Sequence, residues 1–262
     1  MDLGLRNETA VIFGAAGAIG SAIAEAFLKE GACAACVDLE APRLLDASDK
    51  SAAFACDASN LQAVETVFSK ITARFGAIHH VVYAAGIGSG KIGFPFLNVE
   101  PASWEKVFRV NVFGAVNVAH TAAPLLMEQR SGSILFISSV AGQIGSQTDP
   151  PYSASKAALI NFAQCMAKDL APYTVRVNSL CPGMVDSPLM RSIYEAADAQ
   201  KPDAAKQDFD TWAAEKLNKV VPLGRFQSAE EIGAMSVFLA SHAGQNITGQ
   251  TVNVDGGYVM HW

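Results

Sequence analysis

Short apolar runs alternate with longer segments in which apolar residues recur at helical spacing, from residue 9 to about residue 180. The short runs are typical of buried strands, and the longer segments are typical of amphipathic helices. Strands are expected at Thr9–Phe13, Cys33–Val37, Ala52–Cys56, Ile78–Tyr83, Ser133–Ser138, Val175–Leu180 and Thr251–Val254. Helices are expected at Ala18–Glu30, Leu61–Phe75, Ala102–Glu128, Tyr152–Ala171 and Ala229–Ala240, the last capped by Ser228. The alternation predicts parallel strands joined by crossover helices.

This order of elements predicts an α/β fold with a doubly wound, parallel, seven-stranded sheet and helices on both faces. Folds of this class often form one core at a length of 262 residues, so we expect a single domain over residues 1–262. One segment, Ser187 to Lys219, interrupts the alternation, because it is richer in charge and carries Pro188 and Pro202. We expect a substrate lid at about residues 187–219.

Composition narrows the function classes. A net charge of −6, with only 17% charged residues, favours small soluble partners over nucleic acid or an anionic membrane. Cys33 and Cys36, three apart on an expected strand, point to opposite faces, and the histidines lack partners at ligand spacing, so no metal site is expected. The odd number of cysteines and the absence of a signal-like start favour a cytoplasmic setting with reduced thiols.

A glycine-bearing turn joins the first expected strand to the first expected helix. The residues Gly14, Gly17, Ala18, Ile19 and Gly20 follow that strand and open the helix. Glycines in this place let the backbone approach a pyrophosphate, whose charge the helix N-terminus favours. The turn therefore predicts a Rossmann-type dinucleotide site, the alternative being a tight turn with nothing bound.

Residues at the ends of the next three strands extend this site. Asp38, followed by Leu39, ends the second strand, where a carboxylate can accept both ribose hydroxyls of adenosine and would repel a 2′-phosphate. This predicts NAD as the cofactor, although Asp38 could also only cap the strand end. Asp57 and Ala58 follow the third strand and could meet the adenine edge, with a turn or cap role for Asp57 equally open. The small residues that end the fourth strand would admit a flat group, namely Ala84, Ala85 and Gly86.

Tyr152 and Lys156 predict an acid/base pair. They are four residues apart in an expected helix, so they share a face on which the ammonium can stabilise the ionised phenol. Ser139 and Asn111 lie upstream, after the fifth strand and within the third expected helix. Each residue alone could be an ordinary helix or cap residue. Together, downstream of a dinucleotide turn, they indicate hydride-transfer chemistry.

With these residues assembled, the chain resembles the short-chain dehydrogenase/reductase family over essentially its whole length. Ser139, Tyr152 and Lys156 have the spacing of the family's central motif, and Asn111 matches its fourth catalytic position. The resemblance implies that Tyr152 is the acid/base, that Ser139 orients the substrate oxygen, and that Asn111 supports a water chain beside Lys156. It also implies that the nicotinamide is bordered by a further segment, which contains Pro182, Gly183, Val185 and Ser187.

Four positions depart from the family pattern. Phe13 stands where the family usually has Thr, and Ala18 where it usually has Gly. Tyr83 and Ala84 replace asparagines at the end of the fourth strand. We expect these changes to weaken the hold on the cofactor and to leave the chemistry intact.

The sequence therefore predicts an oxidoreductase that transfers a hydride between NAD(H) and a secondary alcohol or ketone. The alternatives are an NADPH-dependent 3-oxoacyl reductase, which Asp38 disfavours, and a noncatalytic dinucleotide sensor. Substrate walls are expected from residues 87–96, 143–151 and the lid, whose mixed charges favour neither an anionic nor a purely apolar ligand. By the resemblance we also expect a homo-oligomer, a dimer or tetramer, that pairs through the helices at 102–128 and 152–171.

Overall fold

The computed structural model describes residues 2–43, 48–91 and 96–260, and its central feature is a seven-stranded parallel sheet. The strand order is β3-β2-β1-β4-β5-β6-β7, and every neighbouring pair is parallel. The strands are β1 Thr9–Phe13, β2 Cys33–Asp38, β3 Ser51–Ala55, β4 His80–Tyr83, β5 Ser133–Ile137, β6 Arg176–Pro182 and β7 Thr251–Val254. This confirms the doubly wound α/β fold, and the predicted strand ends differ from the observed ones by at most two residues.

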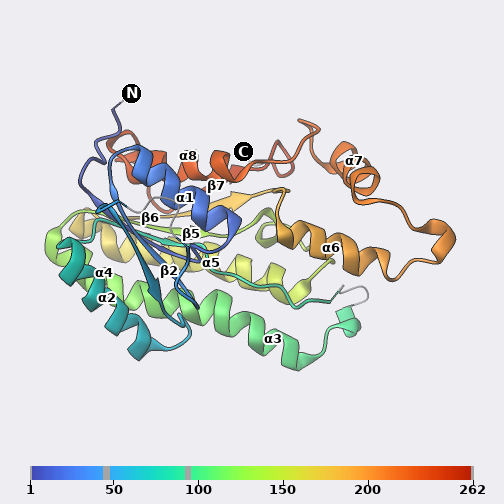
Figure 1. The fold of residues 1–262 in the computed structure, drawn as a ribbon, viewed down its shortest axis with the longest axis horizontal. Coiled ribbons are helices and arrows are strands. Elements are labelled where there is room, and N and C mark those ends of the chain that lie inside the picture. Colours follow the sequence, from blue (N-terminus) through green and yellow to red (C-terminus); the bar gives the residue numbers. More distant parts are fainter. Residues whose placement is uncertain (1, 44–47, 92–95, 261–262) are drawn as a thin grey trace.

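Helices cover both faces of the sheet (Figure 1). They are α1 Ala18–Lys29, α2 Leu61–Phe75, α3 Pro101–Phe108, α4 Ala115–Gln129, α5 Pro150–Leu170, α6 Pro188–Asp198, α7 Phe209–Val220 and α8 Ala229–Ala240. Val11 and Phe13 of β1 pack with α2, α4 and α5, whereas Ala10 and Ile12 pack with α1 and α8. Successive strand residues point to opposite faces, so an apolar run with no polar alternation buries both sides of a parallel sheet.

The predicted helix at 102–128 is instead divided by a turn of π-helix. This turn, Arg109–Gly114, separates α3 from α4 and contains Asn111. Residue periodicity does not reveal such a turn, because it changes the backbone hydrogen bonds without interrupting the helix; single π turns are frequent at functional sites. The helical run Pro101–Gln129 is long and apolar enough to cross a membrane. Its buried residues pack into the core of the fold, and they include Ala115, Val118, Ala119, Ala122 and Leu126.

Local capping explains where two helices begin. Helix α5 begins at Pro150, two residues before the predicted start, because the Asp149 carboxylate accepts the Tyr152 N–H and proline is favourable in the first turn. Ser228 caps α8 as expected, since its hydroxyl accepts the Glu231 N–H and the Glu231 carboxylate accepts the Ser228 N–H at 2.8 Å.

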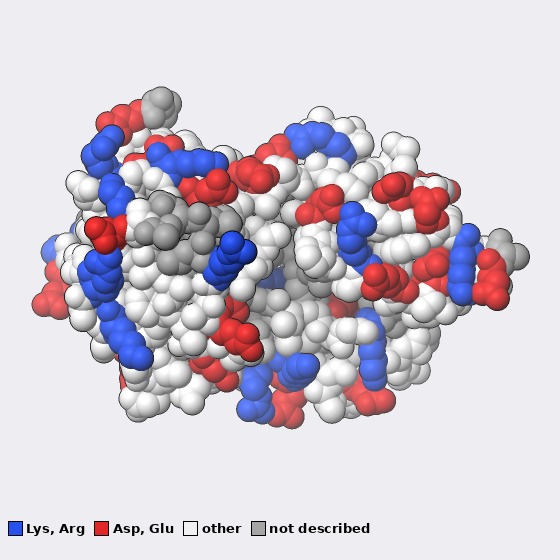
Figure 2. All heavy atoms as spheres, in the orientation of Figure 1, with Lys and Arg blue, Asp and Glu red and all other residues white. Residues whose placement is uncertain are grey.

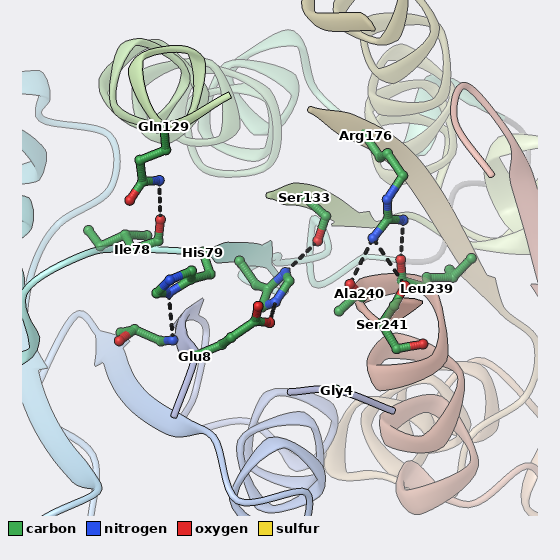
Figure 3. A network of polar contacts seen from close by, with 12 residues as sticks. Gly4, Glu8, Ile78, His79, Gln129, Ser133, Arg176, Leu239, Ala240 and Ser241 are labelled. Carbon is green, nitrogen blue, oxygen red and sulfur yellow. Dashed lines mark hydrogen bonds and ion pairs between the residues drawn. The ribbon is translucent and has the colours of Figure 1, made fainter. Parts of the chain in front are cut away.

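Figure 3 shows a polar network around the beginnings of the strands. The Nε2 atom of His80 lies 2.7 Å from a Glu8 oxygen, and its Nδ1 atom lies 2.9 Å from the Ser133 hydroxyl. Burial lowers the pKa of His80 although Glu8 acts in the opposite direction. Arg176 donates to the terminal carbonyls of α8, including that of Ala240 at 2.7 Å. These contacts satisfy buried polar groups and join the N-terminal segment, the sheet and α8.

The segment 187–219 forms two helices, α6 and α7, which Figure 1 shows standing to one side of the sheet (orange). An aromatic cluster holds them together, with Tyr194 on α6 lying 5.5 Å, between ring centres, from both Phe209 and Trp212 on α7. The Ser187 hydroxyl caps α6. Pro188 begins α6, Pro202 precedes the short turn Asp203–Ala205, and charges of both signs lie on the surface over this part of the molecule (Figure 2). The lid function of this segment stays a prediction.

Candidate active site

A hollow of about 290 Å³ opens where the strand order reverses, between β1 and β4. Open α/β sheets bind ligands at this switch point, outside the carboxyl ends of the strands. Nine of the predicted cofactor residues line it, namely Gly14, Gly17, Asp38, Leu39, Asp57, Ala58, Ala84, Ala85 and Gly86. The fold thus brings together residues from the ends of β1 to β4 that lie far apart in the sequence.

The two aspartates at this hollow are held by backbone N–H groups. One carboxylate oxygen of Asp38 accepts the Ala16 N–H at 2.9 Å, and the other accepts the Leu39 N–H at 2.8 Å. Asp38 therefore faces the glycine turn and does more than end its strand. Asp57 lines the hollow and also accepts the Ser59 N–H at 2.9 Å, so both roles considered for it coexist.

The first turn of α1 lies close to the glycine turn. A Cβ atom placed on Gly20 would lie 2.1 Å from the Gly14 carbonyl oxygen, so only glycine fits there. Ala18 begins α1 on the exposed side. The glycine turn fits the phosphates of a dinucleotide, the Asp38 carboxylate fits its ribose, and the small residues fit its flat adenine ring.

A second hollow, of about 190 Å³, is lined by residues of the predicted catalytic set, and we call it the substrate hollow. Its lining includes Ser139 and Tyr152, the expected nicotinamide neighbours Pro182, Gly183, Val185 and Ser187, and also Ile19 of the glycine turn. The helical segment 187–219 contributes Met190, Ile193 and Lys216 to its wall. The wall expected at 87–96 is described only in part, because residues 92–95 lie outside the described residues.

Tyr152, which lines this hollow, lies beside Lys156. The Lys156 ammonium is 5.5 Å from the centre of the Tyr152 ring and donates to the Ile137 carbonyl at 2.8 Å. Burial raises the pKa of Tyr152 to about 12, with a hydrogen bond from Ser139 acting in the opposite direction. Burial also lowers the pKa of Lys156 to about 8. This raised pKa favours the protonated phenol at neutral pH, so the Lys156 ammonium does not by itself favour the phenolate.

Asn111 is fully buried and holds the loop after β4 beside Lys156. Its side-chain amide accepts the Ile87 N–H at 2.8 Å and donates to the Ile87 carbonyl at 3.0 Å. A Cβ atom on Gly86 would lie 3.0 Å from Lys156 Nζ and 3.5 Å from Asn111 Oδ1. The fold thus brings all four predicted catalytic residues to one place.

Comparison with known proteins agrees with this geometry. A family model described as enoyl-(acyl carrier protein) reductase matches residues 14–259. The 3-oxoacyl-[acyl-carrier-protein] reductase of Thermotoga maritima is 30% identical, with 98% of this chain and 99% of that protein covered. The chain belongs to the short-chain dehydrogenase/reductase family.

Two further relatives of this short-chain dehydrogenase/reductase are named as dehydrogenases of a polyol and of a sugar. The galactitol 2-dehydrogenase of Agrobacterium fabrum is 31% identical, with 98% of this chain and 99% of that protein covered. The structure of a Thermoplasma acidophilum aldohexose dehydrogenase superposes with a TM-score of 0.86 at 30% identity, covering 98% of this chain and 95% of that one. The family membership establishes an oxidoreductase that uses a nicotinamide dinucleotide.

Two residues support this site in ways that were not predicted from the sequence, namely Ser155, which was not singled out, and Tyr83, which was noted only as a departure from the family pattern. Ser155, fully buried on α5, accepts from the Asn111 amide at 2.9 Å and donates to the Tyr152 carbonyl at 2.7 Å. Tyr83, also fully buried, donates to the Val110 carbonyl at 2.6 Å. A polar residue on the buried side of a helix was the available signal for Ser155. The contact of Tyr83 gave no such signal, because its acceptor, the Val110 carbonyl, lies in the π turn.

We expect Tyr83→Phe to lower kcat several-fold and to change the cofactor Kd little. The phenol braces the π turn one residue before Asn111, and its loss removes a hydrogen bond to the half-buried Val110, worth about 0.5–1.5 kcal/mol. Steady-state kinetics and thermal unfolding measure the two effects, with Tyr173→Phe as the control, because Tyr173 is half-buried in the turn after α5 and lines neither hollow. An unchanged kcat together with a large loss of stability would show that Tyr83 has only a packing role.

Proposed function

We propose that this protein is an NAD-dependent dehydrogenase that interconverts a small secondary alcohol and its ketone. The observation that carries this proposal is the Asp38 carboxylate, held by the Ala16 and Leu39 N–H groups at the rim of the dinucleotide hollow. A carboxylate there accepts ribose hydroxyls and repels a 2′-phosphate. Among the described residues that line that hollow there is no lysine or arginine to bind such a phosphate.

The arrangement of the four polar residues supports the chemistry. A dinucleotide held by Gly14, Gly17 and Asp38 would supply hydride transfer to or from the carbinol carbon, and its oxidised form would supply a positive charge. Tyr152 takes the alcohol proton during oxidation and returns it during reduction. Ser139 hydrogen-bonds the substrate oxygen and orients it, and Lys156 favours the phenolate by its charge. Asn111 holds the backbone at Ile87.

A second candidate is an NADPH-dependent 3-oxoacyl reductase, because several relatives carry that name at about the same identity as the polyol dehydrogenases. Asp38 argues against it on electrostatic grounds. A noncatalytic sensor is disfavoured because the catalytic set is complete. We further propose a homo-oligomer, supported by Phe113 and Val116, which are exposed apolar residues where the π turn meets α4.

Cofactor preference is the decisive measurement. We expect NADH to bind at least ten times more tightly than NADPH in a fluorescence titration, which needs no substrate. The same order is expected for kcat/KM over a panel of alcohols and ketones. Asp38→Ser should reduce the NADH preference by weakening NADH and strengthening NADPH. The matched control is Glu40→Gln, which removes a charge two residues away, on an exposed side chain outside the hollow.

Two results would decide against the proposal. Tighter binding and faster turnover with NADPH in the natural protein would favour the 3-oxoacyl reductase. Binding of either nucleotide without turnover of any alcohol or ketone would favour the sensor.

A further inference from the structure

One basic side chain enters the substrate hollow from the segment 187–219. Lys216 of α7 lines the hollow that contains Ser139 and Tyr152. It also lines an adjoining hollow of about 310 Å³, and Thr148 and Ile193 line both as well. These three residues therefore lie where the two hollows meet. Lys216 is half-buried at this place, although most of α7 is exposed.

Within the described part of the chain, Lys216 has no anionic partner. Two other lysines of the segment are paired, Lys201 with Asp198 and Lys206 with Asp203. Lys216 makes no such pair, and burial alone lowers its pKa, with no neighbouring charge contributing. Its ammonium instead lies 4.7 Å from the centre of the Trp212 ring, a cation–π contact that replaces part of the lost hydration.

The other charge in this hollow is already engaged. One Asp149 oxygen accepts the Ser89 N–H at 2.7 Å, and the other accepts the Tyr152 N–H at 3.3 Å. Asp149 thus holds the start of α5 and the loop after β4, and it gives the hollow one negative side. Lys216 gives it a positive side on α7. Most of the remaining wall is apolar, with Ile144, Met184, Met190 and Ile193.

A partly desolvated cation without a partner is unfavourable unless a ligand supplies the opposite charge. The hollow has about 190 Å³, enough for a small molecule only. A ligand that puts its reacting carbon beside Tyr152 can therefore reach Lys216 with a group at its other end. An oxyanion is the group that satisfies an ammonium there.

Building on the dehydrogenase function proposed above, we propose that Lys216 binds one anionic group of the substrate, at the end away from the carbinol carbon. The substrate class is a small hydroxy acid, or the corresponding keto acid, whose anionic group is a carboxylate, a sulfonate or a phosphate. Oxidation transfers a hydride from the carbinol carbon to the oxidised cofactor and a proton from the hydroxyl to Tyr152. The anionic group is unchanged and serves to orient the molecule.

Binding of unreactive analogues tests the site without turnover. The full-length protein with NADH is titrated calorimetrically with butanoate, propane-1-sulfonate, propyl phosphate and the neutral butanamide. We expect at least one anion to bind ten or more times more tightly than butanamide, and Lys216→Met to abolish the difference, whereas Lys216→Arg preserves it. Lys219→Met is the matched control, because Lys219 lies on the same helix but lines only the outer hollow. Equal binding of all four compounds, or an unchanged preference in Lys216→Met, would overturn the proposal.

Kinetics separates this proposal from the function on which it rests. With 3-oxobutanoate and its neutral methyl ester, we expect Lys216→Met to raise KM tenfold or more for the acid only, with kcat little changed. Anion-selective binding without reduction of any ketone would retain the Lys216 site and remove the dehydrogenase function. Reduction of neutral ketones without anion-selective binding would retain the dehydrogenase and remove the Lys216 site.

Discussion

We expect Tyr152→Phe to bind NADH normally and to lose turnover by about a hundred- to ten-thousand-fold, the range that general acid/base catalysis contributes. The phenol is the group in the substrate hollow that lies beside both Ser139 and the Lys156 ammonium. Phenylalanine keeps the ring in its place on α5 and removes only the hydroxyl group, with its transferable proton. Because the backbone contact of Asp149 with residue 152 is retained, α5 should begin at the same residue.

Single-turnover kinetics with saturating cofactor, together with fluorescence titration of NADH, measure this loss of chemistry without confusion with binding. Tyr173→Phe, which removes a half-buried phenol in the turn after α5, is the control and should behave as the natural protein. Turnover within threefold of normal in Tyr152→Phe would remove Tyr152 from the mechanism. A parallel loss of NADH binding would instead mean that the substitution damages the site as a whole.

The protonation of Tyr152 sets the direction in which the rate of each reaction, reduction and oxidation, depends on pH. Burial raises the pKa of Tyr152 to about 12, so the phenol is protonated, and ready to donate, throughout the neutral range. Reduction of a ketone should therefore be insensitive to pH near neutrality. Oxidation needs the phenolate and should accelerate as the pH rises.

The strands and most helices could be predicted because a strand buried on both faces is a continuous apolar run, and a helix buried on one face has apolar residues at helical spacing. Val11 and Ile12 must both be apolar, since each faces a different helical layer. The predicted site residues meet because parallel strands bring their carboxyl ends to one edge. Asp38, at the end of β2, thus reaches the Ala16 N–H of the turn after β1.

Other features depend on contacts that no local pattern records. The π turn around Asn111 is a change in backbone hydrogen bonding, and Tyr83 finds Val110 only once that turn exists. The charge of the segment 187–219 is mixed in composition, and it gave no preference for an anionic ligand. The packing of α6 on α7, through Tyr194 and Trp212, places Lys216 at the substrate hollow. Lys201 and Lys206 of the same segment instead pair with aspartates.

Phe13 illustrates the same limit at a departure from the family pattern. Its ring is fully buried and lies 6.0 Å, between ring centres, from that of Phe68. The side chain thus contributes to the core beneath the glycine turn, where a hydroxyl would otherwise be. The predicted weakening of cofactor binding stays a prediction, and the turn itself offers a sharper test.

The final expectation concerns the glycine turn: Gly14→Ala should destabilise the fold and abolish tight NADH binding together. Gly14 has a φ of +85°, and a Cβ atom there would lie 2.4 Å from the Ala85 nitrogen and 2.6 Å from the Ala84 carbonyl carbon. Those backbone atoms cannot rotate away as a flexible side chain can, so β1 and β4 must separate where the cofactor is expected. The left-handed conformation alone costs an alanine roughly 1–2 kcal/mol, and the collision adds to that cost.

Gly224→Ala separates the two contributions, because Gly224 also has a positive φ, of +65°, but nothing lies within 4 Å of its added Cβ atom. If the collision brings the total cost to about 3 kcal/mol or more, the melting temperature of Gly14→Ala should fall by about 6–12 °C, at roughly 2–4 °C per kcal/mol for a chain of this size. That of Gly224→Ala should fall by only a few degrees, with NADH binding unchanged. Thermal unfolding and NADH titration of both variants provide the comparison. Equal losses of stability in the two variants, with NADH binding intact in Gly14→Ala, would contradict this expectation. The ends of β1 and β4 could then separate without disturbing the cofactor site, and the close approach of Gly14 to Ala85 would not shape that site.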